Sequence, residues 1–144
     1  MASRPLSEYR LHRRVNFYET DCAGIVHFSW FFRYMEEAEH AMWRHAGLTI
    51  APRGDIGFPR VAASFDYLKP LRFEDEFDVH LRVAAVTEKT IRYTCELTRG
   101  GVQIASGTTT VACATVRPGE PMRAVPFPAE IAGRFEVAAG AGAS

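Results

Sequence analysis

The feature that most constrains the fold of this sequence is an amphipathic segment spanning residues 28–46. Its apolar residues recur at spacings of three and four, the period of an α-helix with one buried face. These residues are Phe28, Phe31, Phe32, Met35, Ala38, Met42 and Ala46. Charged residues such as Arg33, Glu36 and Arg44 lie between them, and Gly47 follows directly. Because glycine is typical of the position just after a helix, the segment predicts one helix of about five turns.

Most of the remaining chain has the pattern of strands. Segments rich in β-branched and aromatic residues, separated by turn signals, predict strands over residues 9–20, 61–67, 77–86, 91–98 and 102–116. Two prolines and two glycines make residues 51–60 a loop, and the glycine pair at 100–101 favours a tight turn. A short helix is expected over residues 128–135. This order predicts an α+β fold in which a curved antiparallel sheet packs around one helix.

Length, charge and cysteine usage exclude several broad classes. A chain of 144 residues suits one domain, which we assign to residues 1–136. The Ala- and Gly-rich stretch 137–144 is expected to be a disordered tail. The 17 basic and 17 acidic residues balance, so we expect no nucleic-acid or membrane partner. The first ten residues lack a signal-peptide apolar region, and the three cysteines lack CxxC spacing. A cytoplasmic protein with free thiols is expected.

A motif just before the predicted helix is similar to a known family signature. The stretch FYETDCAGIVHF at residues 17–28 has an aromatic residue, two acidic positions around a small residue, and a Gly-apolar-Val step. It resembles the signature of the 4-hydroxybenzoyl-CoA thioesterase family. The stretches at residues 66–71 and 121–126 are similar to later landmarks of that family and occur in the same order. The resemblance covers about residues 13–135.

This resemblance implies a hot-dog fold, in which an antiparallel sheet wraps around one long central helix. It implies an acyl-CoA thioesterase that forms dimers, usually paired into tetramers, with active sites at subunit interfaces. It implies no metal, and no cofactor beyond the coenzyme A of the substrate. We expect a small aromatic or a short- or medium-chain acyl-CoA. Apolar residues on both sides of the later strands, such as Val111 and Ala112, also favour a homo-oligomer.

The residues of this motif suit thioester hydrolysis. As a carboxylate, Asp21 can attack the carbonyl carbon or act as a general base toward water. Backbone N–H groups at the start of a helix can stabilise the oxyanion that forms. By resemblance the donor is the N–H of Phe28, with Gly24 nearby. Taken alone, Asp21 would be interpreted as a turn or capping residue, but the surrounding motif favours catalysis.

Neighbouring residues offer alternatives. His27 suits a role as a base and a role as a polar residue at the helix entry equally well; many relatives carry histidine at the position of Phe28 instead. Cys22 fits a small core residue better than a nucleophile. Glu19 would point to the same side as Asp21 in an extended segment, but we expect it to be a solvated charge at a strand end. Glu39, near the polar flank of the helix, is expected to be solvated or at an interface.

Coenzyme A carries phosphates, which Arg and Lys side chains bind. The candidates are Arg60, Lys69, Arg72 and Arg92. The five histidines show no spacing suited to zinc. Two other functions stay open: a hot-dog dehydratase or hydratase, and a non-catalytic acyl-CoA-binding module. The presence of Asp21 and Gly24 argues weakly against the binding module.

Overall fold

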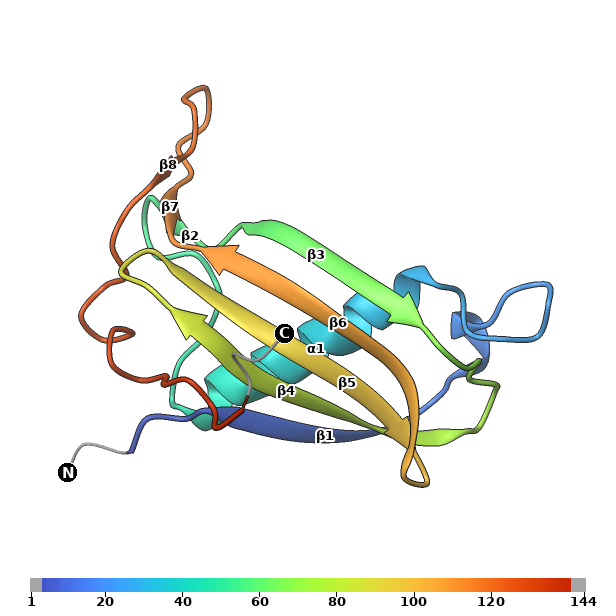
Figure 1. Cartoon of the computed structure of the whole chain (residues 1–144). Coiled ribbons are helices and arrows are strands. Elements are labelled where there is room, and N and C mark those ends of the chain that lie inside the picture. The colour runs from blue at the N-terminus through green and yellow to red at the C-terminus, as the bar shows by residue number, and fades with distance from the viewer. Residues whose placement is uncertain (1–3, 141–144) are drawn as a thin grey trace.

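The structure, a computed structural model, describes residues 4–140. A single long helix, α1 (Ser29–His45), lies across one face of a five-stranded antiparallel sheet (Figure 1). The strand order is β1 (Glu8–Arg14), β4 (Glu76–Val86), β5 (Thr90–Arg99), β6 (Val102–Ala112) and β3 (Arg60–Tyr67). The prediction of an antiparallel sheet wrapped around one long central helix is confirmed. No helix within residues 4–140 is long and apolar enough to cross a bilayer.

Helix α1 begins and ends where its apolar pattern predicts. Phe28 is its N-cap residue, and Gly47 follows within two residues of its last turn. The residues buried along the helix are Phe31, Tyr34, Met35, Ala38, Glu39, Met42 and Trp43. Each large apolar side chain buried in this way stabilises the fold by about 1.5–3 kcal/mol. Trp43 Nε1 also donates a 3.0 Å hydrogen bond to the hydroxyl of Tyr93 on β5, which joins the helix to the sheet.

Strand β5 alternates regularly between the core and the outer face, the period-2 pattern of a strand with one buried face. The core-facing residues of β5 are Ile91, Tyr93, Cys95 and Leu97. Register shifts occur in the pairs β3–β6, β4–β5 and β5–β6, and such bulges bend a sheet. Gly107 on β6 allows β3 to approach closely, because a Cβ there would lie 2.4 Å from the carbonyl oxygen of Ser64.

A second, small sheet extends from one end of the main sheet. It consists of β2 (Ile56–Gly57), β7 (Ala114–Thr115) and β8 (Arg123–Ala124), and the connection between β7 and β8 projects away from the body (Figure 1). The strand predicted over residues 102–116 is therefore interrupted at Cys113. The N–H of Cys113 still donates to the carbonyl of Lys89, just before β5, at 2.8 Å, whereas its carbonyl accepts from the N–H of Val125, just after β8, at 2.9 Å; the chain therefore passes from the main sheet to the small sheet at this residue.

Of two predicted elements near the ends of the domain, one is right only in its first part and the other is wrong. The strand expected over residues 9–20 stops at Arg14, and Phe17–Glu19 forms a short 3₁₀ helix, η1. The Asn16 N–H donates to the Glu19 carboxylate at 2.8 Å, a local side-chain bond that competes with strand pairing. The helix expected over residues 128–135 is a series of turns. No helix forms at its end because the backbone there pairs with Leu6. The Leu6 N–H donates to the carbonyl of residue 134, and the Leu6 carbonyl accepts from the N–H of residue 136.

The segment after residue 136 is only partly the tail that we expected. Ala138 is buried, and its N–H donates to the carbonyl of Val83 on β4 at 2.9 Å. The expectation of an unanchored chain is therefore wrong at this residue, because a backbone hydrogen bond and a small side chain suffice to hold it against the sheet. Residues 141–144 lie outside the described residues.

Candidate active site

The loop between β1 and α1 folds into a tight turn that presents Asp21. The Asp21 N–H donates to the Ile25 carbonyl, and the Gly24 N–H donates back to the Asp21 carbonyl, each at 2.9 Å. Gly24 has a φ of 79°, a left-handed conformation that favours glycine. Asp21 Oδ1 accepts a hydrogen bond of 2.9 Å from the Ala23 N–H, while the side chain stays exposed. The turn therefore orients the carboxylate and leaves it open to a ligand.

This carboxylate opens onto a cavity of about 440 Å³ at the amino end of α1. Three segments form the wall: the turn, the start of the helix, and the chain at and after the end of β3. The lining residues are Asp21, Ile25, Val26, Phe28, Phe31, Tyr67, Leu68, Lys69 and Pro70. The wall is mostly apolar and carries a single carboxylate and a single ammonium group, a composition typical of a site for a small organic ligand.

The amino end of α1 contributes a hydrogen-bond donor at the same cavity. Phe28 is 62% exposed rather than buried on the apolar stripe, because it stands at the N-cap, where the chain enters the helix. Within residues 4–140 its backbone N–H donates to no other residue. An unpaired N–H at the positive end of the helix dipole is suited to an anion or a developing oxyanion.

Tyr67, at the end of β3, is a cavity residue that the sequence did not single out. Its hydroxyl donates a 3.1 Å hydrogen bond to the carbonyl oxygen of Phe28, and its ring meets the Phe31 ring edge-on at 4.9 Å. Burial raises the pKa of Tyr67, so the hydroxyl is a neutral donor at neutral pH. Its signals in the sequence are its place in the family-like stretch 66–71 and an aromatic residue at a strand end, and neither indicates a role for the hydroxyl.

His27 and Cys22 lie beside the cavity without lining it. The His27 ring is exposed, forms a 2.8 Å hydrogen bond with the Ser29 hydroxyl through Nδ1, and lies 4.5 Å from the Phe28 ring. Cys22 is exposed rather than a small core residue, because it falls at the tip of the turn. Within residues 4–140 no group of three His, Cys, Asp or Glu side chains is arranged to hold a metal ion.

The four basic residues predicted for coenzyme A are not gathered at one place. Lys69 lines the cavity, and Arg72 is exposed three residues further along the same segment. Arg60 donates instead to the Glu39 carboxylate and to the Thr109 hydroxyl, each at 2.6 Å. Arg92, near the start of β5, has a buried Nε with no hydrogen-bond partner among residues 4–140.

Two acidic residues that we expected in solvent are buried. Glu19 and Glu39 are both 0% exposed; Glu39 accepts from Arg60, and Glu19 accepts from Arg13. For Glu39 the expectation failed because Arg60 is 21 residues away in the sequence; for Glu19 it failed because Arg13, six residues earlier, lies on β1 and reaches Glu19 only after the chain folds back at η1. One local signal for Glu19 was present. It lies three residues after Asn16, the spacing at which a side chain can accept from the N-cap N–H.

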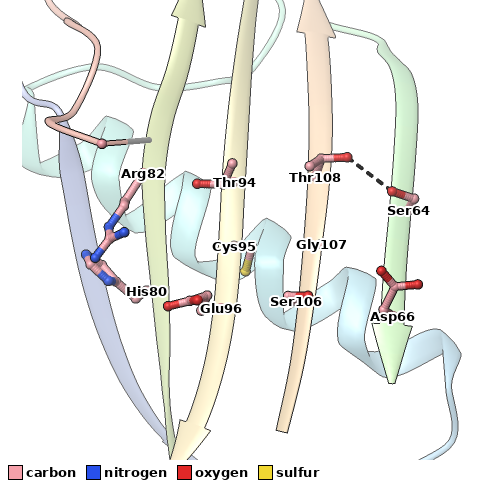
Figure 2. A pocket seen from close by; sticks show the side chains of 11 residues that line it. Ser64, Asp66, His80, Arg82, Thr94, Cys95, Glu96, Ser106, Gly107 and Thr108 are labelled. Carbon is pink, nitrogen blue, oxygen red and sulfur yellow. Dashed lines mark hydrogen bonds between the residues drawn. The ribbon is translucent and has the colours of Figure 1, made fainter. Parts of the chain in front are cut away.

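A second hollow, of about 270 Å³, lies on the face of the sheet away from α1 (Figure 2). Side chains from β3, β4, β5 and β6 line it, including Asp66, His80, Arg82 and Glu96, and Ser64 is hydrogen-bonded to Thr108 at 3.1 Å. None of the predicted site residues lies there. This part of the outer face is polar: Ser106 and Thr108 of β6 face outward, whereas Val111 of the same strand is a core residue.

A single helix wrapped by one antiparallel sheet, with a carboxylate-bearing turn at the amino end of the helix, defines a protein of the hot-dog class. The match to known families is consistent with this architecture. Residues 15–135 match the thioesterase-like superfamily, and the chain belongs to this family.

Individual relatives agree with the predicted resemblance. A 1,4-dihydroxy-2-naphthoyl-CoA hydrolase of Synechococcus elongatus is 26% identical over 112 residues, which cover 75% of this chain and 82% of that protein. The structure of a gentisyl-coenzyme A thioesterase is 28% identical, with a TM-score of 0.74 over 85% of this chain and 98% of that one. A 4-hydroxybenzoyl-CoA thioesterase mutant in complex with 4-hydroxybenzoyl-CoA shares the fold, at 20% identity and a TM-score of 0.74, over 86% of this chain and 95% of that one.

Proposed function

We propose that the protein hydrolyses the thioester of an acyl-coenzyme A in the cavity at the amino end of α1. The observation that carries this proposal is that Asp21 and Phe28 line the same cavity. A carboxylate and an unpaired backbone donor are the two groups that thioester hydrolysis requires. The names of the relatives, hydrolases and thioesterases of coenzyme A esters, support the same reaction.

The Asp21 carboxylate can act in either of two ways. It attacks the thioester carbonyl carbon and expels the coenzyme A thiolate, and water then hydrolyses the resulting anhydride; or it takes a proton from a water molecule that attacks that carbon. In both routes negative charge collects on the carbonyl oxygen. The Phe28 N–H and the helix dipole stabilise that charge, and the turn closed by Gly24 holds Asp21 near them.

His27 takes an auxiliary part in this proposal. It is adjacent to Phe28 and exposed beside the cavity, where it can exchange protons with solvent. No metal and no cofactor beyond the coenzyme A of the substrate has a part in the reaction. Turnover is therefore expected to continue unchanged in EDTA.

The coenzyme A part of the substrate is placed along the segment that follows β3. The Lys69 ammonium at the cavity wall and the nearby Arg72 guanidinium are suited to its phosphates. Arg60 and Arg92 do not line this cavity. In this arrangement they could contact only a coenzyme A bound in the cavity of a neighbouring subunit. The acyl group occupies the apolar wall formed by Phe28, Phe31 and Tyr67, which suits a small aromatic or a short- or medium-chain acyl group.

We also propose that the protein is a cytoplasmic homo-oligomer, a dimer or a dimer of dimers. Strand β3 is an edge of the main sheet, and most of its side chains are exposed. Large apolar side chains that line the cavity are also exposed; they include Phe28 (62%), Leu68 (55%) and Tyr67 (44%). Contiguous exposed apolar surface and an open strand edge favour association. Light scattering that gives a 16.1 kDa monomer at micromolar concentration would contradict this part of the proposal.

One assay separates the proposed function from the alternatives. The full chain is incubated with a panel of acyl-CoA esters. The release of free thiol is measured, and the mass of the acyl product is determined by mass spectrometry. A thioesterase releases free coenzyme A and the carboxylic acid. A dehydratase or hydratase changes the acyl mass by one water and leaves the thioester intact, and a binding module does neither. Absence of thiol release across aromatic, short-chain and medium-chain esters would overturn the proposal.

A further inference from the structure

A buried charge cluster anchors the turn that carries Asp21. Glu19, two residues before Asp21, is 0% exposed. Its carboxylate accepts from the two terminal nitrogens of Arg13 at 2.8 and 2.5 Å, and from the Asn16 N–H and the Tyr34 hydroxyl at 2.8 Å each. All of these donors lie outside the turn itself, so the carboxylate is a fixed attachment point.

The cluster connects three elements of the fold. Arg13 belongs to β1, Glu19 to η1, and Tyr34 to α1. Arg13 also donates to Glu37 on α1, at 2.6 Å from Nε and 3.1 Å from a terminal nitrogen, and its guanidinium lies 4.6 Å from the centroid of the Tyr34 ring. Any shift of η1 relative to the helix would break several short, charge-assisted bonds at once.

Backbone hydrogen bonds connect Glu19 to both parts of the candidate site, the Asp21 turn and the amino end of α1. The Glu19 carbonyl accepts from the His27 N–H at 2.9 Å, directly before Phe28. The next residue, Thr20, forms an antiparallel bridge with Val26. Fixing Glu19 therefore fixes the position at which the Asp21 turn starts and the position at which the chain enters α1.

The electrostatics favour a charged Glu19. Burial alone would raise the pKa of this carboxyl, but Arg13, the Asn16 N–H and the Tyr34 hydroxyl bring the pKa below its usual range. For Tyr34, burial and the neighbouring Glu19 raise the pKa, so its hydroxyl keeps its proton. A buried ion pair is often no more stabilising than apolar residues of similar volume, and fixing one geometry is a use for which such pairs are retained.

We propose that Glu19, held by Arg13 and Tyr34, is a positioning residue that sets the Asp21 carboxylate against the amino end of α1. Glu19 does not touch the substrate; it acts through Asp21. The inference rests on the proposed function, because it requires that Asp21 performs the reaction. A displacement of a reacting group by about 1 Å can lower a rate on the order of a hundredfold.

Glu19→Gln is the main test. It keeps the shape of the side chain, but one oxygen becomes an amide nitrogen that faces other donors, so the four hydrogen bonds can no longer all form. We expect kcat to fall about 10–100-fold, with KM changed less than about threefold, because the apolar wall of the cavity is untouched. Tyr34→Phe removes one of the four bonds and should lower kcat by a smaller factor. It also keeps the test open if Glu19→Gln fails to fold.

Glu39→Gln is the matched control. Glu39 is also a 0% exposed carboxylate bound to an arginine, Arg60. It lies ten residues after Ser29 on α1, about 15 Å along the helix. A general loss of stability from neutralising a buried carboxylate would affect both variants. Only Glu19→Gln should lower kcat under conditions where circular dichroism shows both proteins folded.

A double-mutant cycle separates positioning from a general structural role. If Glu19 acts through Asp21, then adding Glu19→Gln to Asp21→Asn should leave the residual rate unchanged. Equal losses of kcat in the Glu19 and Glu39 variants, or additive losses in the double mutant, would overturn the inference. If Asp21→Asn is inactive but folded Glu19→Gln keeps full kcat, the inference about Glu19 is overturned and the proposed function stands. Full kcat in Asp21→Asn would instead remove the proposed function as well.

Discussion

Replacing Asp21 with asparagine tests the centre of the proposed chemistry. The amide keeps an oxygen in place of Oδ1, which accepts the 2.9 Å hydrogen bond from Ala23. The side chain is also exposed, so the free energy of unfolding should change by less than about 0.5 kcal/mol. The exchange removes the negative charge, and with it both attack on the carbonyl and proton removal from water. Loss of a general base lowers a rate by about 10²–10⁴, equivalent to about 2.7–5.4 kcal/mol of activation free energy.

The measurement is release of free thiol at saturating acyl-CoA, with a thermal melt of each purified variant. We expect kcat of Asp21→Asn to fall at least about a hundredfold, with KM and Tm close to wild type. Cys22→Ser is the control, because it changes the next residue of the same turn and should leave kcat nearly unchanged. Wild-type kcat in folded Asp21→Asn protein would refute the reasoning, and loss of activity in Cys22→Ser would move the nucleophile to the neighbouring residue.

Three further predictions follow from single contacts. Tyr67→Phe removes only the hydroxyl that donates to the Phe28 carbonyl at 3.1 Å. This hydrogen bond holds Phe28, whose N–H is the proposed oxyanion donor. Its loss, about 0.5–1.5 kcal/mol, should lower kcat about two- to tenfold with little change in KM. An unchanged kcat would show that the Tyr67 hydroxyl does not help to position Phe28. Gly107→Ala places a Cβ 2.4 Å from the Ser64 carbonyl oxygen, so overpacking should lower stability by about 1–3 kcal/mol; an unaltered thermal midpoint would contradict it. Because the folded state lowers the pKa of Glu19 below its ordinary value of 4.5, its stabilising effect is complete above that value and is lost as the pH falls. Melting scans should show a weaker acid dependence in Glu19→Gln than in wild type, and parallel curves would count against this assignment.

Much of the fold follows from local periodicity. The spacing of Phe31, Met35, Ala38 and Met42 determines a helix with one buried face, because those residues meet on one side regardless of what covers them. Alternation in β4 and β5 likewise determines which residues face the core. The Asp21 turn was also accessible from the sequence, since its hydrogen bonds to Ala23 and Ile25 form within a few residues.

Only the tertiary structure decided how charged residues and the chain ends are used. Glu19 and Glu39 are buried because arginines from β1 and β3 reach them, and no local pattern shows that a strand will place an arginine against either carboxylate. The same holds for the basic residues: Lys69 lies at the cavity and Arg60 does not, although both are ordinary cations in the sequence. The cavity itself forms where the end of β3 passes the amino end of α1. Its lining depends on long-range packing, which the sequence specifies only through the complete fold.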